Sequence, residues 1–356
     1  MQAAADAAPL LADPLATLAR IRLLPDQLAP EPLALACDQI YDWAERAGLL
    51  TVAVHFAEAS AYVDPLNPRW AVRAGYMTRA AGGVEMFARS EVWHARAFVL
   101  AVQGRDRDMV LRALTGAGAL AHDRGDHAQA RRFYLRAARR AIRESRRRRA
   151  AVALHYAFVV DVETEHFRVA VRDANAALNH YPLHDERIPA FAHDVAYLLI
   201  HHRHYGTALR LVDGLGDRVD GIASRGMLYG VAARAAAGVG HEGSYEAAAG
   251  AALNIARVND ECAGPVFVNL AEAARFLGHW EAAAGHAGRA LTVARQRADR
   301  EVERLAAELL GRIKRREPPP PPSEPASDSP LAALARRLAA RVRRWRRYAR
   351  GVGTQV

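Results

Sequence analysis

GDHAQA, at residues 125–130, returns as GHWEAA at residues 278–283. Both stretches place a turn residue before a bulky side chain and an alanine three residues after it. Aligned on the bulky position, the copies follow one another at intervals of 35 to 40 residues. The bulky residues are Leu50, a residue near Phe87, His127, Phe167, Tyr205, Tyr245 and Trp280. This period predicts a helical repeat array, and such arrays bind partners along a surface.

Small and apolar residues lie at helical spacing on both sides of the turn in each copy. Leu114, Gly118 and Ala121 precede the turn at residue 125. Ala130 and Ala137 follow it. Spacings of three, four and seven residues place side chains on one face of a helix. We therefore expect two helices in each copy, packed closely through their small side chains.

The order of these residues resembles the tetratricopeptide repeat, in which a small residue, a turn, an aromatic residue, alanines and a closing proline follow one another. Prolines close two copies, at Tyr181-Pro182 and at Asp64-Pro65. The resemblance implies an all-α, right-handed superhelical solenoid of about six or seven hairpins. The pitch exceeds the family's usual 34 residues and is similar to that of the sensor arrays of bacterial regulators. The chain thus resembles a bacterial tetratricopeptide repeat protein.

Four segments are predicted along the chain. Residues 1–32 are an N-terminal segment without the basic start and apolar stretch of a signal peptide. Residues 33–316 hold the repeats, closed by a capping helix through Glu301, Leu305, Leu309 and Ile313. Residues 317–330 are a proline-rich linker, for which an extended geometry is expected. Residues 331–356 form a basic amphipathic tail.

Most of the net positive charge of the chain lies in this tail. Of a formal net charge of +10 over 356 residues, residues 331–356 contribute eight arginines and no acid. The remaining residues carry 41 basic and 39 acidic groups. The sequence has no run of eighteen apolar residues, and its two cysteines cannot build a disulfide framework. These features predict a cytoplasmic protein.

The tail is expected to form one amphipathic helix. Its apolar residues recur at intervals of three and four, and they are Leu331, Leu334, Leu338, Val342 and Trp345. A stripe of this kind flanked by arginines fits an anionic membrane surface, which would make the protein peripheral to a membrane. The residues predicted to bind that surface are Arg336, Arg337, Arg341, Arg343, Arg344, Trp345, Arg346 and Arg347.

Other roles also fit the tail. A disordered or weakly helical solubilising tail also fits, and so does a helix that docks on an acidic partner or in the groove of the array itself. Contact with nucleic acid is disfavoured, because only Trp345 and Tyr348 are available for stacking and no groove-reading motif is present.

The tetratricopeptide resemblance implies that the first helix of each repeat lines a concave groove. Carried onto this sequence, the groove-facing positions are Thr115, Ala119, His122, His155, Val159, His193, Tyr197, Glu272 and Arg275. Imidazole, aromatic and charged groups together suit a protein or peptide ligand.

No enzyme, cofactor or metal site is predicted. His201-His202-Arg203-His204 is the densest histidine cluster, but it falls at a hairpin turn without spaced cysteines or acids, so an exposed polar turn is expected. His193 and Asp194 are adjacent on a helix, where side chains point about 100° apart, so we expect no pairing between them. The sequence lacks a nucleophile elbow and a phosphate-binding glycine loop.

Arginines crowd residues 131–149, between two repeats. A solvated helix end explains them, because cations there complement the helix dipole. A phosphate or acidic-peptide site is the alternative.

These observations favour an adaptor that holds a protein or peptide in the groove of a repeat array. One alternative is a peptide-sensing regulatory protein that acts through a transcription or signalling partner. Direct DNA control is not expected, because residues 1–32 are too short for a DNA-binding domain. Another alternative is a peripheral membrane scaffold tethered by the basic tail. The partner and the oligomeric state stay open.

Overall fold

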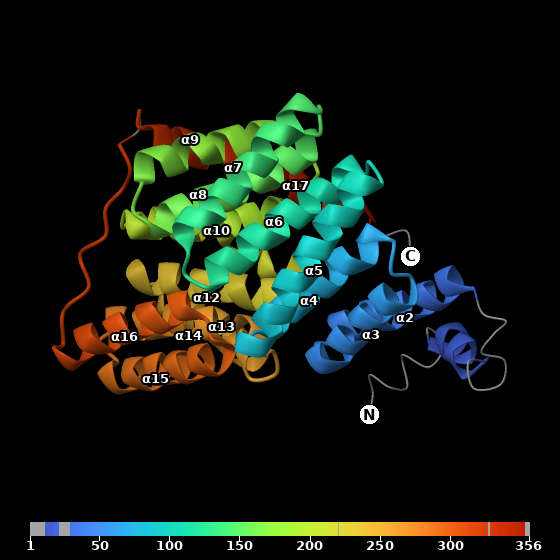
Figure 1. Cartoon of the computed structure of the whole chain (residues 1–356). Coiled ribbons are helices and arrows are strands. Elements are labelled where there is room, and N and C mark those ends of the chain that lie inside the picture. The colour runs from blue at the N-terminus through green and yellow to red at the C-terminus, as the bar shows by residue number, and fades with distance from the viewer. Residues whose placement is uncertain (1–10, 21–28, 220, 327, 353–356) are drawn as a thin grey trace. The chain divides into compact units, whose positions relative to one another are not determined.

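The computed structural model describes residues 11–20, 29–219, 221–326 and 328–352. Helices are the regular elements of these ranges, and they follow one another in pairs joined by short turns (Figure 1). The all-α repeat solenoid that the sequence predicts is thus confirmed. Residues 1–10 and 21–28 of the predicted N-terminal segment lie outside the described residues.

Within the described residues, a helical segment at residues 11–20 is followed by seven consecutive helix pairs and two further helices. The pairs are α2 (Pro30–Arg46) and α3 (Leu50–Val63), α4 (Pro68–Ala81) and α5 (Val84–Gln103), α6 (Arg107–Asp123) and α7 (His127–Arg143), α8 (Arg147–Glu163) and α9 (Phe167–His180), α10 (Ile188–His201) and α11 (Tyr205–Val212), α12 (Ile222–Gly238) and α13 (Glu242–Ala256), and α14 (Asp260–Phe276) and α15 (Trp280–Arg297). The further helices are α16 (Arg300–Lys314) and α17 (Pro330–Val352), and a short 3-10 helix spans Gly216–Arg218. The repeats begin at Pro30, three residues before the predicted start.

The bulky residue of the repeat pattern marks where second helices begin. It is the first residue of the second helix at Leu50, His127, Phe167, Tyr205 and Trp280. The alanines three residues later are fully buried, and they are Ala53, Ala130, Ala170, Ala208 and Ala283. A side chain larger than a methyl group would hold the paired helices apart at these positions. The local pattern therefore sets both the turn and the distance between the helices.

A residue in the left-handed conformation closes the first helix of most pairs. The backbone angle φ is positive two residues before the second helix at Gly48, Gly125, Glu165, Arg203, Gly240 and Gly278. This conformation turns the chain while the following amides bond back to the last helical carbonyls. Glycine adopts it without strain, whereas Glu165 and Arg203 adopt it at a cost.

The chain forms two compact units, Met1–Ala121 and His122–Val356. The first contains α2 to α5 and most of α6, with Trp70 and Trp93 buried in its core. The second contains the end of α6 and the helices from α7 to α17. Alanine is the commonest residue in the core between α12 and α16, which lets these helices approach closely.

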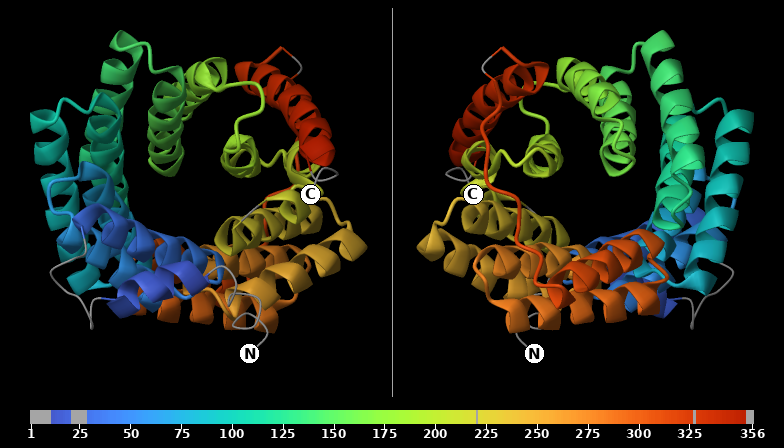
Figure 2. Two further views of the ribbon diagram at one scale, coloured as in Figure 1. Left: turned by 90° about the vertical axis from the view of Figure 1, so that its right-hand side faces the viewer. Right: turned by 90° about the vertical axis from the view of Figure 1, so that its left-hand side faces the viewer.

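The proline-rich linker runs extended along the second unit and leads into α17 (Figure 2). Ser323 attaches it to the turn between α10 and α11. The Ser323 amide donates to the Arg203 carbonyl at 2.8 Å, and its hydroxyl donates to the His202 carbonyl at 3.0 Å. Thr207 donates to the Glu324 carboxylate at 2.9 Å. The histidine-rich turn is therefore where the linker binds.

Helix α17 packs beside α9, α10 and α11 through its apolar stripe. Leu334 and Leu338 are fully buried, and Trp345 is 7% exposed. Arg337 donates to the side chains of Asn175 and Asn179 on α9. Of the roles considered for the tail, docking on the repeats is the one seen here, and the stripe that lipid would contact is covered by protein. None of the described helices combines the length and apolar character that a bilayer crossing requires.

Candidate functional site

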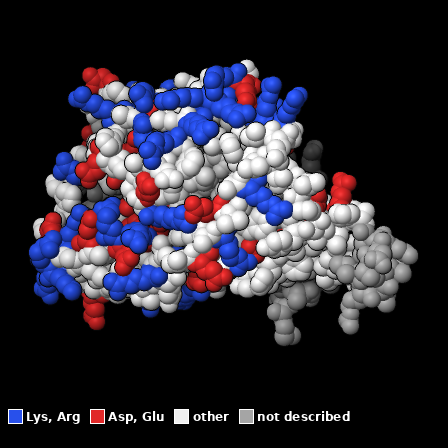
Figure 3. Space-filling model, viewed as in Figure 1, with Lys and Arg blue, Asp and Glu red and all other residues white. Residues whose placement is uncertain are grey.

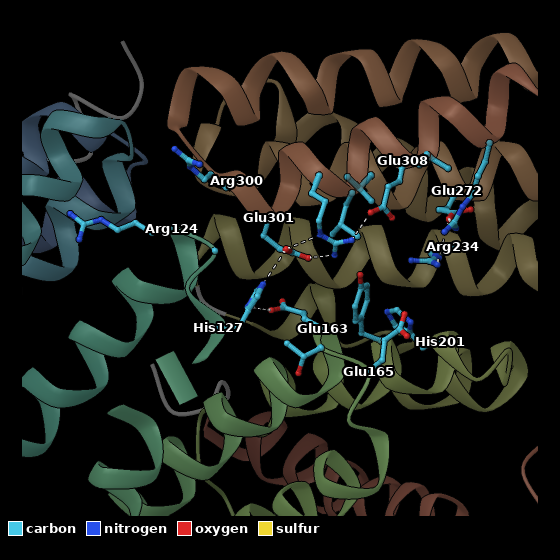
Figure 4. A pocket seen from close by; sticks show the side chains of 18 residues that line it. Arg124, His127, Glu163, Glu165, His201, Arg234, Glu272, Arg300, Glu301 and Glu308 are labelled. Carbon is cyan, nitrogen blue, oxygen red and sulfur yellow. Dashed lines mark hydrogen bonds and ion pairs between the residues drawn. The ribbon is translucent and has the colours of Figure 1, made fainter. Parts of the chain in front are cut away.

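A cavity of about 680 Å³ lies in the second unit, among α7, α8, α10, α12, α14 and α16 (Figure 4). Its volume is typical of ligand sites in proteins. Its charged lining residues are Arg124, Arg234, Arg300, Arg304, Arg312, Glu163, Glu165, Glu272, Glu301 and Glu308. Guanidinium and carboxylate groups are equal in number, so the cavity suits a ligand that carries both signs of charge.

The first helices contribute their last turns to this cavity. Glu163 is the last residue of α8, and His201 is the last residue of α10. Arg234 lies in the last turns of α12. Helices α8, α10, α12 and α14 pack against one another in sequence order, so the residues before successive turns gather at one end of the stack. The repeat itself therefore builds this side of the cavity.

Helix α16 supplies another wall. Its charged residues Glu301, Arg304, Glu308 and Arg312 recur at intervals of three and four, which places them along one face. Arg304 lies 2.6 Å from Glu301 and 2.7 Å from Glu308. Burial acts to raise the pKa of Glu301, but hydrogen bonds from His127 and Arg304 lower it to about 2. Glu301 is thus a carboxylate in the folded chain at neutral pH.

At one end of the cavity, three arginines surround Glu272. The Glu272 carboxylate lies 2.7 Å from Arg275, 3.8 Å from Arg234 and 3.9 Å from Arg312. Burial acts to raise the pKa of Glu272, but these guanidinium groups lower it. The Arg234 guanidinium also lies over the Tyr197 ring, 5.8 Å from its centre. One carboxylate cannot neutralise three guanidinium groups, so this end keeps an excess of positive charge.

The other end is rich in histidine and carboxylate groups. Figure 4 shows the His127 side chain between Glu163 and Glu301. Outside the lining itself, His122 Nε2 lies 2.5 Å from the Glu163 carboxylate. Burial acts to lower the pKa of His122, but the charge of Glu163 and hydrogen bonds to Asp123 and Glu163 raise it well above its usual value. His122 and Glu163 therefore form an ion pair.

Four of the residues predicted to line a groove belong to this site or touch it. Tyr197 and Glu272 line the cavity directly. His122 binds Glu163, and Arg275 binds Glu272, both of which are lining residues.

Two other predicted groove residues, His155 and His193, are buried in a polar cluster. Asp194 lies 2.6 Å from His155 Nε2 through one oxygen and 2.6 Å from His193 Nδ1 through the other. The expectation that His193 and Asp194 do not pair was wrong, because the carboxylate lies between two imidazoles that both bond to it. Burial acts to raise the pKa of Asp194, but these two hydrogen bonds lower it. The cluster joins α8 to α10.

Thr115 and Val159 do not line the cavity. Thr115 is buried in the first unit and donates to the Leu111 and Arg112 carbonyls of its own helix. Val159 is half-buried, four residues before the end of α8. The resemblance thus pointed to the first helices, but several of its positions lie in their middle, whereas the cavity is formed by their ends.

Sequence reasoning missed the charged residues His127, Glu163, Arg234, Arg304 and Arg312. The signal for some of them was available, because Glu163 and His127 flank hairpin turns at positions that the repeat alignment had already located. The contribution of α16 had no such signal, since its contact with the earlier repeats depends on packing over more than a hundred residues.

A second cavity, of about 890 Å³, is lined by α7 alone. Its arginines are Arg131, Arg132, Arg136, Arg139 and Arg143, and no carboxylate is among the described lining residues. Figure 3 shows basic side chains gathered along the upper edge of the view, over α7 and α9, and these are arginines. This is the arginine-rich stretch for which the sequence left a solvated helix end and an anion site as alternatives.

No family model and no curated protein matches the sequence. Among solved structures, the chain is similar to the TPR domain of P58(IPK), with 12% identity over 87% of this chain and 94% of that chain, at a TM-score of 0.23. It is also similar to a circular tandem repeat protein, with 14% identity over 93% of this chain and 90% of that chain, at a TM-score of 0.22. Likeness at this level carries no argument about a site. The repeat architecture of the chain rests on its helical hairpins in series.

Proposed function

We propose that this chain is a protein-interaction scaffold that holds a charged peptide segment of its partner in the cavity of the second unit. The observation that supports the proposal is the charged lining of the cavity, with an excess of guanidinium groups around Glu272 at one end. Arg234 and Arg312 lie at that end, whereas Glu163 and Glu301 flank His127 at the other, where Arg124 and Arg300 also lie (Figure 4).

The geometry also indicates how a peptide would bind. A ligand carboxylate, from a side chain or a chain end, would meet the guanidinium groups of Arg234 and Arg312, which bind carboxylates through paired hydrogen bonds. The Tyr197 ring, next to Arg234, offers a flat apolar surface. The helices that line the cavity are already folded, so binding would order few protein groups.

Peptide selection followed by affinity measurement tests this proposal. Peptides selected from a random display library against the full-length chain would be measured by calorimetry with Tyr197→Ala and Arg312→Gln variants. We expect each substitution to weaken binding at least about tenfold, equivalent to 1.4 kcal/mol. Arg257→Gln, which changes an exposed arginine outside the cavity, is the matched control. Unchanged affinity in both cavity variants would refute the proposal.

A peptide-sensing regulatory role is the second candidate. The cavity brings α8 and α10 together with α16, so an occupant that touches both walls would hold distant parts of the second unit in one arrangement. Small-angle scattering with and without a selected peptide tests this role. A shift in the radius of gyration is expected for a sensor. An unchanged scattering profile at saturation would favour a scaffold that does not change shape on binding. The cytoplasmic location stays a prediction.

A further inference from the structure

Three side chains with metal-binding atoms meet at the carboxylate-rich end of the cavity. His122 is next to last in α6, His127 begins α7 and Glu163 ends α8. One ligand atom from each lies within 4.8 Å of the other two. Among the described residues, no other group of three or more histidine, cysteine or acidic side chains has this geometry. The repeat turns bring the group together.

Each imidazole faces Glu163 with one nitrogen and a different carboxylate with the other. His122 Nε2 lies 2.5 Å from the Glu163 carboxylate, and its Nδ1 lies 3.6 Å from Asp123. His127 Nδ1 lies 3.8 Å from the same Glu163 oxygen, and its Nε2 lies 3.4 Å from Glu301. Histidines that bind metals use their second nitrogen in this way, because the carboxylate fixes the ring and makes it a stronger ligand.

The His127 Nδ1 atom is an independent sign of a missing ligand. It is buried, and it forms no hydrogen bond. A buried polar atom without a partner is destabilising. A cation placed among the His122, His127 and Glu163 atoms would coordinate this nitrogen and replace the proton of the His122–Glu163 ion pair.

We infer that His122, His127 and Glu163 bind a divalent transition-metal ion, with zinc as the best match. Two imidazoles and a carboxylate favour zinc over calcium or magnesium, which prefer oxygen ligands. Three protein ligands leave one position of a tetrahedral zinc ion for water or a ligand group. His127 and Glu163 line the cavity, so this position would be reached from it. The inference is independent of the proposed peptide binding, because it is tested with metal alone.

Titration of the metal-free full-length chain with Co²⁺, followed by competition with Zn²⁺, tests the site. We expect one ion per chain, with the visible absorption bands of four-coordinate cobalt. His127→Gln and Glu163→Gln should each lower the zinc affinity by at least about 100-fold. Glu301→Gln, which changes the carboxylate behind His127, should lower it by about 10- to 100-fold.

A histidine outside the site provides the control. His241→Gln, at the exposed residue before α13, should bind zinc like the wild-type chain. Circular dichroism shows whether each variant folds. If the ligand variants do not fold, Glu301→Gln still tests the site. The inference is overturned if the wild-type chain binds no ion, or if His127→Gln and Glu301→Gln bind it as tightly as wild type. Binding that disappears with His202→Gln instead would also overturn it.

Discussion

At the scale of single residues, His94 illustrates how the small residues of the first unit enclose a polar side chain. It is 2% exposed, and neither ring nitrogen has a hydrogen-bond partner. A methyl group added to Gly75 or Gly116 would collide with the ring. Burial and, to a smaller extent, the nearby charge of Arg79 lower the pKa of His94 to about 3. The fold therefore requires a neutral imidazole.

His94 makes the stability of the chain sensitive to acid. Above about pH 6.5 the ring is neutral in both the folded and the unfolded chain, so protonation of His94 takes nothing from the free energy of unfolding. As the pH falls from about 6.5 toward 3, only the unfolded chain takes up the proton, and the loss reaches about 2 to 3 kcal/mol near pH 4.5. In urea unfolding from about pH 7.5 to 4.5, the free energy of unfolding of His94→Leu should rise relative to that of the wild type as the pH falls. Parallel curves for the two proteins would contradict this account.

The left-handed turn residues allow a pair of opposite substitutions. Ser145, with φ 55°, lies exposed before α8, whereas Gly278, with φ 74°, lies before α15 with open space where a side chain would begin. Because this conformation costs an L-residue about 1 kcal/mol, Ser145→Gly should raise the free energy of unfolding by about that amount, and Gly278→Ser should lower it equally. Thermal or urea unfolding measures both. Changes of the same sign would mean that other contacts dominate.

At the scale of elements, α17 is held to the repeats by its buried apolar stripe. Leu338 is fully buried against the repeats, whereas Arg343 on the same helix is exposed. Leu338→Ala should cost about 2 kcal/mol or more in docking. Amide hydrogen exchange within α17 should then accelerate at least about tenfold, while α12 to α15 keep their protection. Arg343→Gln is the control, and uniform acceleration along the chain would point to global unfolding instead.

Docking of α17 also bears on the membrane hypothesis. Trp345 and the leucine stripe are covered, while Arg343, Arg344 and Arg347 are exposed. A helix binds the membrane–water interface by burying its apolar face in the lipid. The wild-type chain, in which this face is covered, should therefore float weakly with phosphatidylserine vesicles. Leu338→Ala, which releases the helix, should float more. A wild-type chain that floats strongly, with no gain in the variant, would show that the exposed arginines suffice.

At the scale of the whole molecule, the sequence predicts the repeats well because their signals are local. A turn residue, a bulky residue such as His127 and a buried alanine such as Ala130 lie within six residues, so their period is visible along the chain. The cavity depends on how α7 and α8 lie opposite α16, where His127 reaches Glu301, and no local pattern encodes this arrangement. Tyr197 and Glu272 were found because they lie on first helices, whereas Arg312 was not. The docked position of α17 likewise depends on a surface that several repeats build together.

Peptide-induced protection from hydrogen exchange in the full-length chain tests the central claim, that the cavity of the second unit is the binding site, most directly. A peptide selected for binding should slow exchange at the turn after α8, residues 163–165, and along α16, residues 300–312, which are the two walls of the cavity. Protection confined to the arginine-rich face of α7, or to α17, would contradict the claim.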